Sequence, residues 1–441
     1  MANPKNPNKK SVLAIRGGKP VRTELFPSCR VIGKEEKEAA CRVIDSGVLS
    51  RYLGCWDPDF MGGPEVQILE KEWAEHFGVK HAIAVNSATS GLISAVGAIG
   101  TEPGDEFIVT PWSMSISATA PLFYGGIPVF ADIEPEHFCL DPEDVRRKIT
   151  PRTKAIIAVD LFGQPYDADA INQIAKEHNL IVIEDAAQAP GAKYKGRYAG
   201  TLGNIGVYSL NYHKHIHTGE GGVIVTNDDG LADRLRLIRN HAEAVVGDKG
   251  NKDLVNMIGY NFRLTELNAA IAREQLKKLE KLNAERQKNC AHVAKRLAKL
   301  PGIKPAPTRK GADHVYYFQP FLFDEKVVGV SRKSFLEAVK AELKPSELRE
   351  QEGVLLNYPY VKPLYMLPIF QKRIAFGKGG YPFNLAGNPL NYAKGLCPNA
   401  ERLDEKSFFS HQLMRPGSSQ KDLDDVCKAF EKVYEHRHEL S

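Results

Sequence analysis

The sequence predicts an α/β protein with a large, mostly parallel β-sheet covered by helices, followed by a smaller α+β region. Three observations favour this fold class. The chain has 441 residues, which is more than one ordinary domain needs. Short strands that are apolar on both faces alternate with helices, as in a parallel sheet that is covered on both sides. After residue 262 this alternation gives way to segments rich in Ala, Leu, Lys and Glu.

The region before the alternation predicts two helices and a loop. Apolar residues recur at helical spacing between residues 33 and 46. Residues 51–63 are rich in glycine and aromatic residues, so we expect a loop there. The second helix should begin at Pro64 and end near Phe77, where Gly78 follows.

Seven apolar segments predict the strands of the large sheet. They are residues 81–85, 106–111, 127–133, 155–163, 180–186, 206–210 and 221–227. Helices are predicted between some of them, at residues 89–99, 115–124 and 167–178. Because crossover helices connect parallel strands, this order predicts a mostly parallel, seven-stranded sheet.

The last third of the chain predicts a second domain. Its elements are one long helix or two at 265–300, a turn-rich linker at 301–310, a strand at 316–322, a helix at 331–342, an irregular segment at 352–398 and a final helix at 420–437. We therefore expect an N-terminal arm over residues 1–40 that packs near the small domain, a large domain over 41–300 and a small C-terminal domain over 301–441.

Composition and charge exclude a nucleic-acid-binding protein. Hydrophobic residues make up 43% of the chain and charged residues 26%, which is ordinary for a globular protein. The 59 basic and 54 acidic residues are interleaved and leave a net charge of +5. The one basic cluster, at Lys5, Lys9 and Lys10, fits a frayed terminus better than a nucleic-acid-binding arm.

The cysteines and the N-terminal sequence predict a cytoplasmic protein without a membrane partner. Seven scattered cysteines, an odd number with no CxxC pair, argue against a disulfide framework and a structural zinc site. The first residues lack the apolar core of a signal peptide. No apolar run approaches the length that spans a bilayer.

An acidic residue stands at the end of a buried strand. In the segment VIEDAAQAP, residues 182–190, Asp185 follows an apolar run. Ligands of open α/β sheets bind at the carboxyl ends of the strands, so this carboxylate is well placed to meet a ligand cation. The alternative is that Asp185 caps the next helix, and the segment alone favours that interpretation.

A lysine lies among histidines in YSLNYHKHIHTGEGG, residues 208–222. Lysine is the residue type for Schiff-base chemistry, although a surface lysine is the simpler interpretation of Lys214 in isolation. The alternating His213, His215 and His217 resemble ligands on one face of a strand. Because no carboxylate or cysteine stands nearby at metal-ligand spacing, we expect no metal site.

Several motifs in the same order resemble one enzyme family. They are LAIRGGKPVR (13–22), NSATSGL (86–92), EDAAQAPGA (184–192), SLNYHKHIHTGEGG (209–222) and GYNFRLTELNAAIA (259–272). Together they resemble the sugar aminotransferases of the DegT/DnrJ/EryC1/StrS family over nearly the whole chain. The resemblance implies an aspartate-aminotransferase-like (fold type I) enzyme whose cofactor, pyridoxal 5'-phosphate, is bound by the large domain.

The resemblance assigns the reactive residues. Lys214 lies five residues before Gly219 of the GEGG turn, where the family has the lysine that forms a Schiff base with the cofactor and moves the proton between Cα and C4′. Asp185 would hold the pyridine nitrogen protonated, so that the ring accepts the carbanion electrons. Gln188 would face the ring or its 3-oxygen.

The resemblance also assigns the phosphate-binding residues and a shared site. Thr89 and Ser90, at a helix start, and Ser209 correspond to the family's phosphate positions. Asn261 corresponds to an asparagine that reaches the cofactor phosphate of the neighbouring subunit, which implies a homodimer with shared active sites.

Three features depart from the family. The chain has Ala88-Thr89-Ser90 where the family usually has Gly-Thr-Ala. The ring-stacking position, commonly aromatic, is occupied by Met114, whereas the nearby Trp112 belongs equally well in the core. The segment 343–400 is longer than in many relatives, and we expect it to shape the substrate pocket.

The function implied is transamination. An amino acid, glutamate or glutamine, would leave its amino group on the cofactor as pyridoxamine 5'-phosphate, and a keto sugar, often nucleotide-linked, or a keto-cyclitol would accept it. A keto-sugar dehydratase of the same family is the nearest alternative, but those enzymes carry histidine where this chain has Lys214. A non-catalytic regulator would have little need for both Lys214 and Asp185. A lyase acting on a small amino acid fits the GEGG and GYNFR segments poorly.

Overall fold

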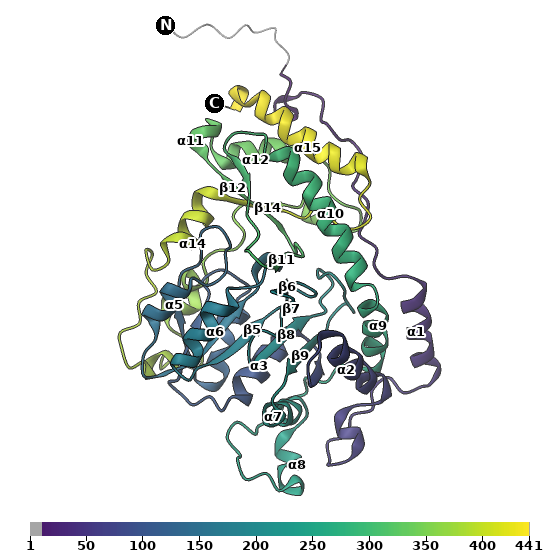
Figure 1. Cartoon of the computed structure of the whole chain (residues 1–441), viewed down its shortest axis with the longest axis vertical. Helices are drawn as coiled ribbons and strands as arrows, with labels where there is room; N and C mark the ends of the chain where they lie inside the picture. The colour runs from purple at the N-terminus through teal and green to yellow at the C-terminus, as the bar shows by residue number, and fades with distance from the viewer. Residues whose placement is uncertain (1–10, 441) are drawn as a thin grey trace.

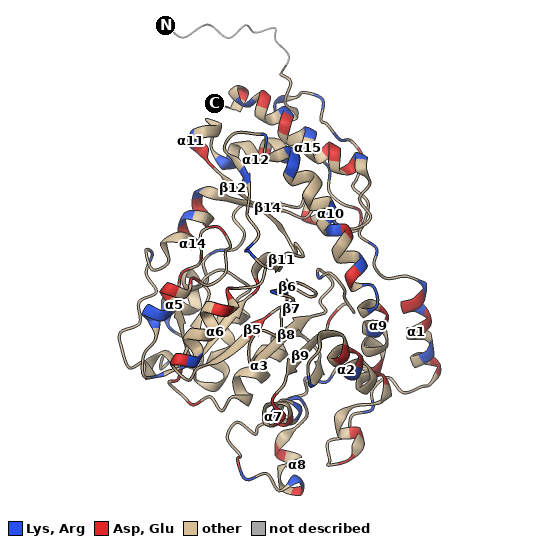
Figure 2. Ribbon diagram, in the orientation of Figure 1, with Lys and Arg blue, Asp and Glu red and all other residues tan. Residues whose placement is uncertain are grey.

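The computed structural model describes residues 11–440 and consists of a large sheet with flanking helices, below a smaller sheet and its helices (Figure 1). The predicted basic cluster at Lys5, Lys9 and Lys10 lies outside the described residues. In the described part of the chain, no helix combines the length and the apolar composition needed to cross a membrane. Lys and Arg are interleaved with Asp and Glu over the helices (Figure 2).

The large sheet has seven strands in the order β1-β9-β8-β5-β4-β2-β3. They are β1 (His81–Val85), β2 (Glu106–Val109), β3 (Ile127–Phe130), β4 (Thr153–Val159), β5 (Ile181–Asp185), β8 (Ile205–Ser209) and β9 (Gly222–Thr226). Strand β9 pairs antiparallel with β1 and β8, and the other pairs are parallel. The predicted fold class is therefore confirmed.

The remaining strands form two smaller sheets. An antiparallel sheet has the order β10-β12-β14-β13, with β10 (Ile303–Pro305), β12 (Gln319–Phe323), β13 (Leu356–Asn357) and β14 (Phe408–His411). A three-stranded sheet contains β6 (Lys193–Tyr194), β7 (Arg197–Tyr198) and β11 (Ala312–Asp313).

Helices cover the sheets and connect them. They are α1 (Lys34–Asp45), α2 (Pro64–Phe77), α3 (Ala88–Ala98), α4 (Ile116–Thr119), α5 (Pro142–Lys148), α6 (Ala168–Glu177), α7 (Asp229–Arg239), α8 (Ala242–Lys249), α9 (Glu266–Leu276), α10 (Leu279–Leu297), α11 (Glu325–Val328), α12 (Arg332–Ala341), α13 (Pro368–Lys372), α14 (Pro398–Arg402) and α15 (Gln420–Glu435). The segment 265–300 is thus two helices.

Some predicted elements end earlier than expected. The strand predicted over 155–163 stops at Val159, because Phe162 and Gly163 adopt left-handed backbone conformations with φ of 61° and 96°. The helix predicted over 115–124 becomes 3-10 at Ala120. The elements not predicted are helices α5, α7, α8, α11, α13 and α14, the two-residue strands β6, β7, β11 and β13, the three-residue β10 and the four-residue β14.

Two segments cross between the predicted domains. The N-terminal segment lies along α15, where Arg22 pairs with Asp422 at 2.7 Å and with Asp425 at 3.1 Å (Figure 1). Residues 364–400 pack into the core of the large sheet, and the rings of Phe370 and Phe130 meet at 5.2 Å. The division of the chain at residues 40 and 300 stays a prediction.

Candidate active site

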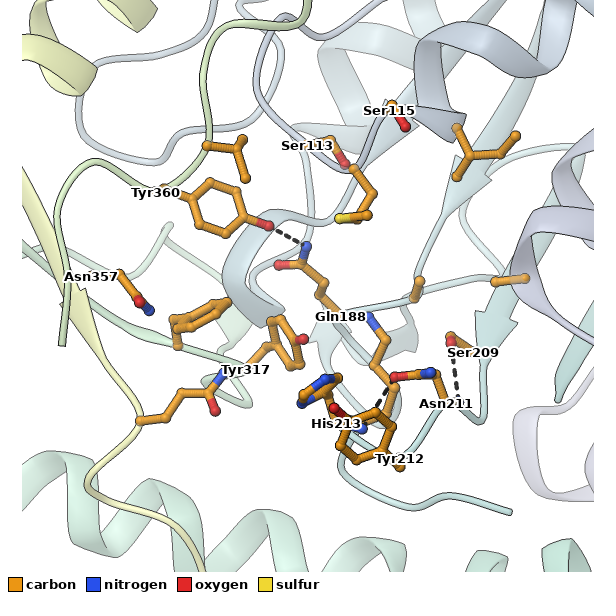
Figure 3. Close-up of a pocket in the computed structure, with 18 of the residues that line it drawn as sticks. Ser113, Ser115, Gln188, Ser209, Asn211, Tyr212, His213, Tyr317, Asn357 and Tyr360 are labelled. Carbon is orange, nitrogen blue, oxygen red and sulfur yellow. Dashed lines mark hydrogen bonds between the residues drawn. The ribbon is translucent and has the colours of Figure 1, made fainter. Parts of the chain in front are cut away.

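A cavity of about 780 Å³ lies at the carboxyl-terminal edge of the large sheet (Figure 3). Residues that follow β1, β2, β5 and β8 line one wall, and residues 349–361 with Gln412 line the facing wall. Of the residues predicted for the site, Thr89, Met114, Asp185, Gln188, Ser209 and Lys214 line this cavity, whereas Ser90 and Asn261 do not.

Asp185 ends β5 and is 4% exposed. Its carboxylate accepts hydrogen bonds from Ser117 Oγ at 2.7 Å and from the Ala187 backbone N–H at 3.2 Å. Burial raises the pKa of this carboxyl group, and the Ser117 hydrogen bond and the charge of Lys214 oppose that shift. Residues 186–192 form turns, so the helix-cap interpretation of Asp185 is wrong. A cation bound in the cavity would stabilise the ionised form of this buried carboxyl group.

Lys214 lies in the turn that connects β8 to β9. Its backbone N–H donates to the carbonyl of Asn211 at 2.9 Å, which fixes the turn. Its Nζ lies 4.5 Å from the centroid of the Tyr317 ring. Because Lys214 is half-buried and lines the cavity, the surface-lysine interpretation does not hold.

The start of α3 forms the end of the cavity beside Ser209. The backbone N–H groups of Ala88 and Thr89 have no acceptor within the described part of the chain, so this helix start can bind an anion. Gly222 allows the start of α3 to approach β9 closely, since a Cβ at residue 222 would lie 2.7 Å from the Ala88 nitrogen. The Ser90 hydroxyl does not line the cavity, and its Oγ is hydrogen-bonded to Asn86 and Ser87.

Gln188 connects the two walls of the cavity (Figure 3). Its Oε1 accepts a hydrogen bond from the Phe162 backbone N–H at 2.9 Å. Its Nε2 donates to the hydroxyl of Tyr360 at 2.9 Å. Tyr360 belongs to the facing wall, and burial raises the pKa of its hydroxyl group.

Met114 and Trp112 lie in different environments. Met114 lines the cavity and is 58% exposed. Trp112 is fully buried, and its indole N–H donates to the carbonyl of Val361 at 2.8 Å. Trp112 therefore belongs to the core behind the cavity, while Met114 remains available to contact a ligand.

Asn261 lies on the surface near Asn240, with which it forms an isolated β-bridge. Its Oδ1 accepts a hydrogen bond from Arg263 Nε at 2.8 Å. Its predicted role toward a neighbouring subunit stays a prediction.

The alternating histidines point to three different places. His213 lines the cavity, where burial and the charge of Arg349 lower the pKa of its ring to about 4. His215 is buried, with its Nε2 3.0 Å from the carbonyl of Val315. His217 lines a second cavity. These three rings therefore do not converge on one metal ion.

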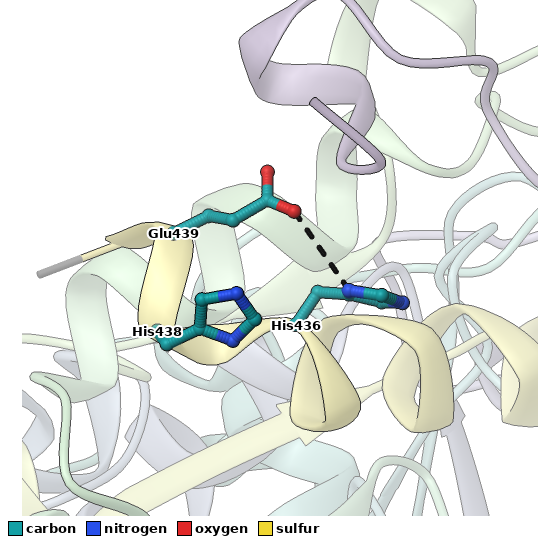
Figure 4. A group of neighbouring side chains, drawn as sticks. All are labelled: His436, His438 and Glu439. Carbon is teal, nitrogen blue, oxygen red and sulfur yellow. Dashed lines mark ion pairs between the residues drawn. The ribbon is translucent and has the colours of Figure 1, made fainter. Parts of the chain in front are cut away.

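His436, His438 and Glu439 form a different group, after α15 (Figure 4). Their nearest ligand atoms lie within 4.8 Å of one another. The Glu439 carboxylate is also bonded to Ser11 and to the Val12 backbone N–H, so it fastens the N-terminal segment to the C-terminal one.

A second pair of acids lies behind Asp185. Asp160 and Glu184 are fully buried, and the Asp160 N–H donates to the Asp185 carbonyl at 3.1 Å. Glu184 accepts from the backbone N–H groups of Leu202 and Gly203, at 2.8 and 3.0 Å. Burial raises the pKa of both carboxyl groups, and the charge of Glu184 raises that of Asp160 further. Both carboxyl groups therefore bind a proton more readily in the folded protein than in the unfolded chain.

The side chains of the facing wall were not predicted from the sequence. The long segment 343–400 was expected to shape the pocket, but none of its residues was singled out. The structure brings Arg349, Glu352, Asn357 and Tyr360 from that segment to the cavity. On the sheet wall, Ser117 was also not predicted. The run of small polar residues after β2 is the sequence pattern that could have indicated it.

The family is decided by a comparison of the whole chain with known proteins. The model of the DegT/DnrJ/EryC1/StrS aminotransferase family matches residues 54–382. The chain belongs to this family. It is therefore a pyridoxal-phosphate-dependent sugar aminotransferase with the fold type I architecture.

Individual relatives of this DegT/DnrJ/EryC1/StrS member match over nearly their full length. Spore coat polysaccharide biosynthesis protein SpsC of Bacillus subtilis (strain 168) is 32% identical, over 93% of this chain and 98% of its own. An L-glutamine:2-deoxy-scyllo-inosose aminotransferase of Streptoalloteichus tenebrarius is 31% identical, over 97% and 99%. The X-ray structure of an aminotransferase from Psychrobacter cryohalolentis has a TM-score of 0.78 and 28% identity, over 94% and 100%.

The cavity fits the cofactor of the family. A lysine, a buried carboxylate and the open start of α3 line one cavity. Asp185 lacks a cationic partner within ion-pair distance in the described residues, and a protonated pyridine nitrogen supplies one. Thr89 and Ser209 line the same cavity, and their hydroxyl groups are donors of the kind that a phosphate group needs.

Proposed function

We propose that this protein transfers the amino group of glutamate or glutamine to the keto group of a cyclitol or sugar. The observation that carries the proposal is the meeting of Lys214, Asp185 and Thr89 in one cavity. The name of the Streptoalloteichus tenebrarius relative contains both a glutamine donor and a keto-cyclitol acceptor, which supports this pair of substrates.

Bound pyridoxal phosphate supplies an electron sink for the carbanion that forms at the amino-bearing carbon. The chain supplies the proton transfer and the orientation. Lys214 would be the base that moves the proton from the donor's α-carbon to C4′ of the cofactor and, in the second half-reaction, from C4′ to the new amino-bearing carbon. Asp185 would hold a proton on the pyridine nitrogen of the bound cofactor through an ion pair that burial strengthens.

The facing wall supplies hydrogen bonds for a hydroxylated substrate. Asn357, Gln412 and Tyr360 offer donors and acceptors without net charge. The positive charge of Arg349 is offset by Glu352, with 2.6 Å between Arg349 Nε and Glu352 Oε1. Such a wall suits the many hydroxyl groups of a cyclitol or a sugar ring.

A homodimer with shared active sites completes the proposal. The surface near Asn261 carries apolar side chains, and Ile258 is 73% exposed. Leu254 and Trp56 are also exposed, at 58% and 45%. Exposed apolar side chains of this size are common at protein–protein contacts. Light scattering should give twice the chain mass, and Asn261→Ala should weaken cofactor binding; a monomer that binds the cofactor normally contradicts this part.

The test of the proposed function is an absorbance spectrum of the purified protein before and after borohydride. The cofactor band should shift when glutamate or glutamine is added, and borohydride should fix the cofactor on the peptide that contains Lys214. Lys214→Ala should lose this labelling, whereas Lys281→Ala, an exposed position on α10, should keep it.

Two other outcomes would change the assignment. A colourless protein that takes up no added pyridoxal phosphate would contradict an enzyme function. A cofactor band that ignores every amino acid, with preference for pyridoxamine phosphate, would favour the keto-sugar dehydratase. A positive half-reaction would be followed by a screen of keto-cyclitols and keto sugars for the acceptor.

A further inference from the structure

A second cavity lies beside the active-site cavity. Its volume is about 160 Å³, and it shares Tyr212, Arg349 and Gln412 with the first cavity as a common wall. Its other walls come from the N-terminal segment around Ser28 and from the residues that follow β14, among them Arg415. Three segments far apart in the sequence therefore enclose one small space.

In the part of the chain that the structure describes, two arginines lack a neutralising carboxylate: Arg415, which lines this cavity, and Arg286, whose charge acts on Arg415. Arg286 is 2% exposed, donates from Nη1 to the carbonyl of Tyr316 at 3.2 Å, and has a buried Nε without an acceptor. Arg415 lines the cavity, donates from Nη2 to the carbonyl of His213 at 3.3 Å, and also has a buried Nε without an acceptor. In residues 11–440, no carboxylate lies within 4.0 Å of either guanidinium group.

The groups around the second cavity carry an excess of positive charge. Burial, followed by the charges of Arg286 and Arg349, lowers the pKa of Arg415 to about 10, so the group stays protonated at neutral pH. The positive charge of Arg349 is offset by Glu352. Burial and the charge of Arg415 lower the pKa of His217 on the cavity wall.

The carboxylate at this cavity does not neutralise the arginines. Glu347 lies at the exposed rim, where it accepts a hydrogen bond from Ser28 Oγ at 3.4 Å. Glu36, which does not line the cavity, partly opposes the lowering of the His217 pKa. A guanidinium with unmade hydrogen bonds in a largely desolvated position is unfavourable unless an anion pairs with it. The space and the charge both favour a small anion.

We propose that the second cavity binds a small oxyanion, a carboxylate or phosphate group, against Arg415. The guanidinium supplies two donors to one oxyanion, which is the geometry that arginine favours. The hydroxyl of Ser418, on the same wall, adds a donor. The site is separate from the phosphate position at Thr89 and Ser209, which line the first cavity only.

The experiment uses the full-length protein saturated with pyridoxal phosphate, so that the phosphate position of the first cavity is filled. Inorganic phosphate and acetate are titrated separately against chloride at constant ionic strength, and the thermal unfolding midpoint and calorimetric binding heat are measured. Because an anion that binds the folded state stabilises it, each oxyanion that fits should raise the midpoint saturably. If only phosphate or only acetate raises the midpoint, that result identifies which oxyanion the cavity binds.

Variants locate the binding. Arg415→Gln should weaken the apparent affinity at least tenfold, whereas Arg42→Gln, an exposed arginine on α1, should leave it unchanged. Ser418→Asp places a carboxylate on the cavity wall and should abolish the response while raising the midpoint without added anion. This second variant decides the matter if Arg415→Gln does not fold.

Two results would overturn the proposal. One is a wild-type protein whose midpoint follows ionic strength alone, with no saturable response to phosphate or acetate. The other is an equal saturable response in the wild type and in Ser418→Asp, which would place the anion elsewhere.

Discussion

One wall of the active-site cavity is the edge of a buried sheet, whereas the facing wall is a run of loops. On the sheet wall, Asp185 and Ser209 end paired strands, and their positions follow from strand register. On the facing wall, residues 349–361 contain only the two-residue strand β13, and the side chains there are placed by packing and hydrogen bonds. The comparison indicates that the sheet wall carries the chemistry common to the family and the loop wall carries the choice of substrate.

The largest expected effect comes from the sheet wall. Asp185→Asn removes the negative charge that faces the cofactor ring, so we expect kcat to fall about 1000-fold, on the scale of losing one preorganised electrostatic contact. The Ser117 hydrogen bond can still form, so the fold should persist. Stopped-flow absorbance of the donor half-reaction measures the change. Near-wild-type turnover would show that the sheet wall does not control the chemistry.

The acids behind the sheet wall should control stability through pH. Burial raises the pKa of Asp160 and Glu184, so the folded protein keeps a proton that the unfolded chain releases. The contribution of the two acids to the free energy of unfolding is complete below the ordinary aspartate pKa of about 3.9. It is lost as the pH rises toward their raised pKa values in the folded protein, at about 1.4 kcal/mol per pH unit for each proton. Asp160→Asn should therefore become progressively more stable than the wild type above pH 4.

Urea unfolding midpoints between pH 4 and pH 9 measure this difference. Asp248→Asn, at an exposed position on α8, should follow the wild type at every pH. Parallel curves for Asp160→Asn and the wild type would show that the buried pair does not retain its proton.

Loss of the hydrogen bond between the two walls should lower activity less than loss of the Asp185 charge. Tyr360→Phe removes the hydrogen bond to Gln188 Nε2, which is worth about 1 kcal/mol, so we expect a five- to tenfold loss in kcat/KM for the acceptor. The donor half-reaction should change little if the loop wall serves the acceptor. Tyr434→Phe on α15 is the matched control. Equal losses in both half-reactions would remove the division between the walls.

Met114 should have the smallest effect. It is 58% exposed at the cavity, and a thioether–ring contact is worth about 0.3–1.5 kcal/mol. Met114→Ala should therefore weaken pyridoxal phosphate binding two- to tenfold, as measured by fluorescence titration of the cofactor-free protein. An unchanged affinity would assign the ring contact to another residue.

The sequence predicted the sheet wall better than the loop wall for a physical reason. Strand patterns are local, so the seven strands of the large sheet and the position of Asp185 at a strand end follow from short apolar runs. The contacts of Tyr360 depend on Gln188, 172 positions away, and no local pattern contains such a pair. The same holds for Arg415, whose neighbours come from three distant segments.

Local patterns also explain the errors at strand and helix ends. The apolar run from Ala155 to Phe162 continues past the end of β4, so composition alone cannot show the left-handed turn at Phe162. The short strands β6 and β7 contain too few residues to show alternation. Ser90 matched the family motif, yet its hydroxyl bonds to Asn86, and that choice depends on the turn before α3.

The indole of Trp112 makes the loop wall visible to optical spectroscopy. Its N–H is held by the carbonyl of Val361, and its ring meets that of Tyr360 at a centroid distance of 5.6 Å. If the loop wall moves away from the sheet, this indole loses its apolar surroundings and its emission moves to longer wavelength. The chain has three tryptophans, and Trp73 lies in a separate core cluster while Trp56 is 45% exposed. Replacing those two leaves a natural fluorophore that reports substrate entry without any attached dye.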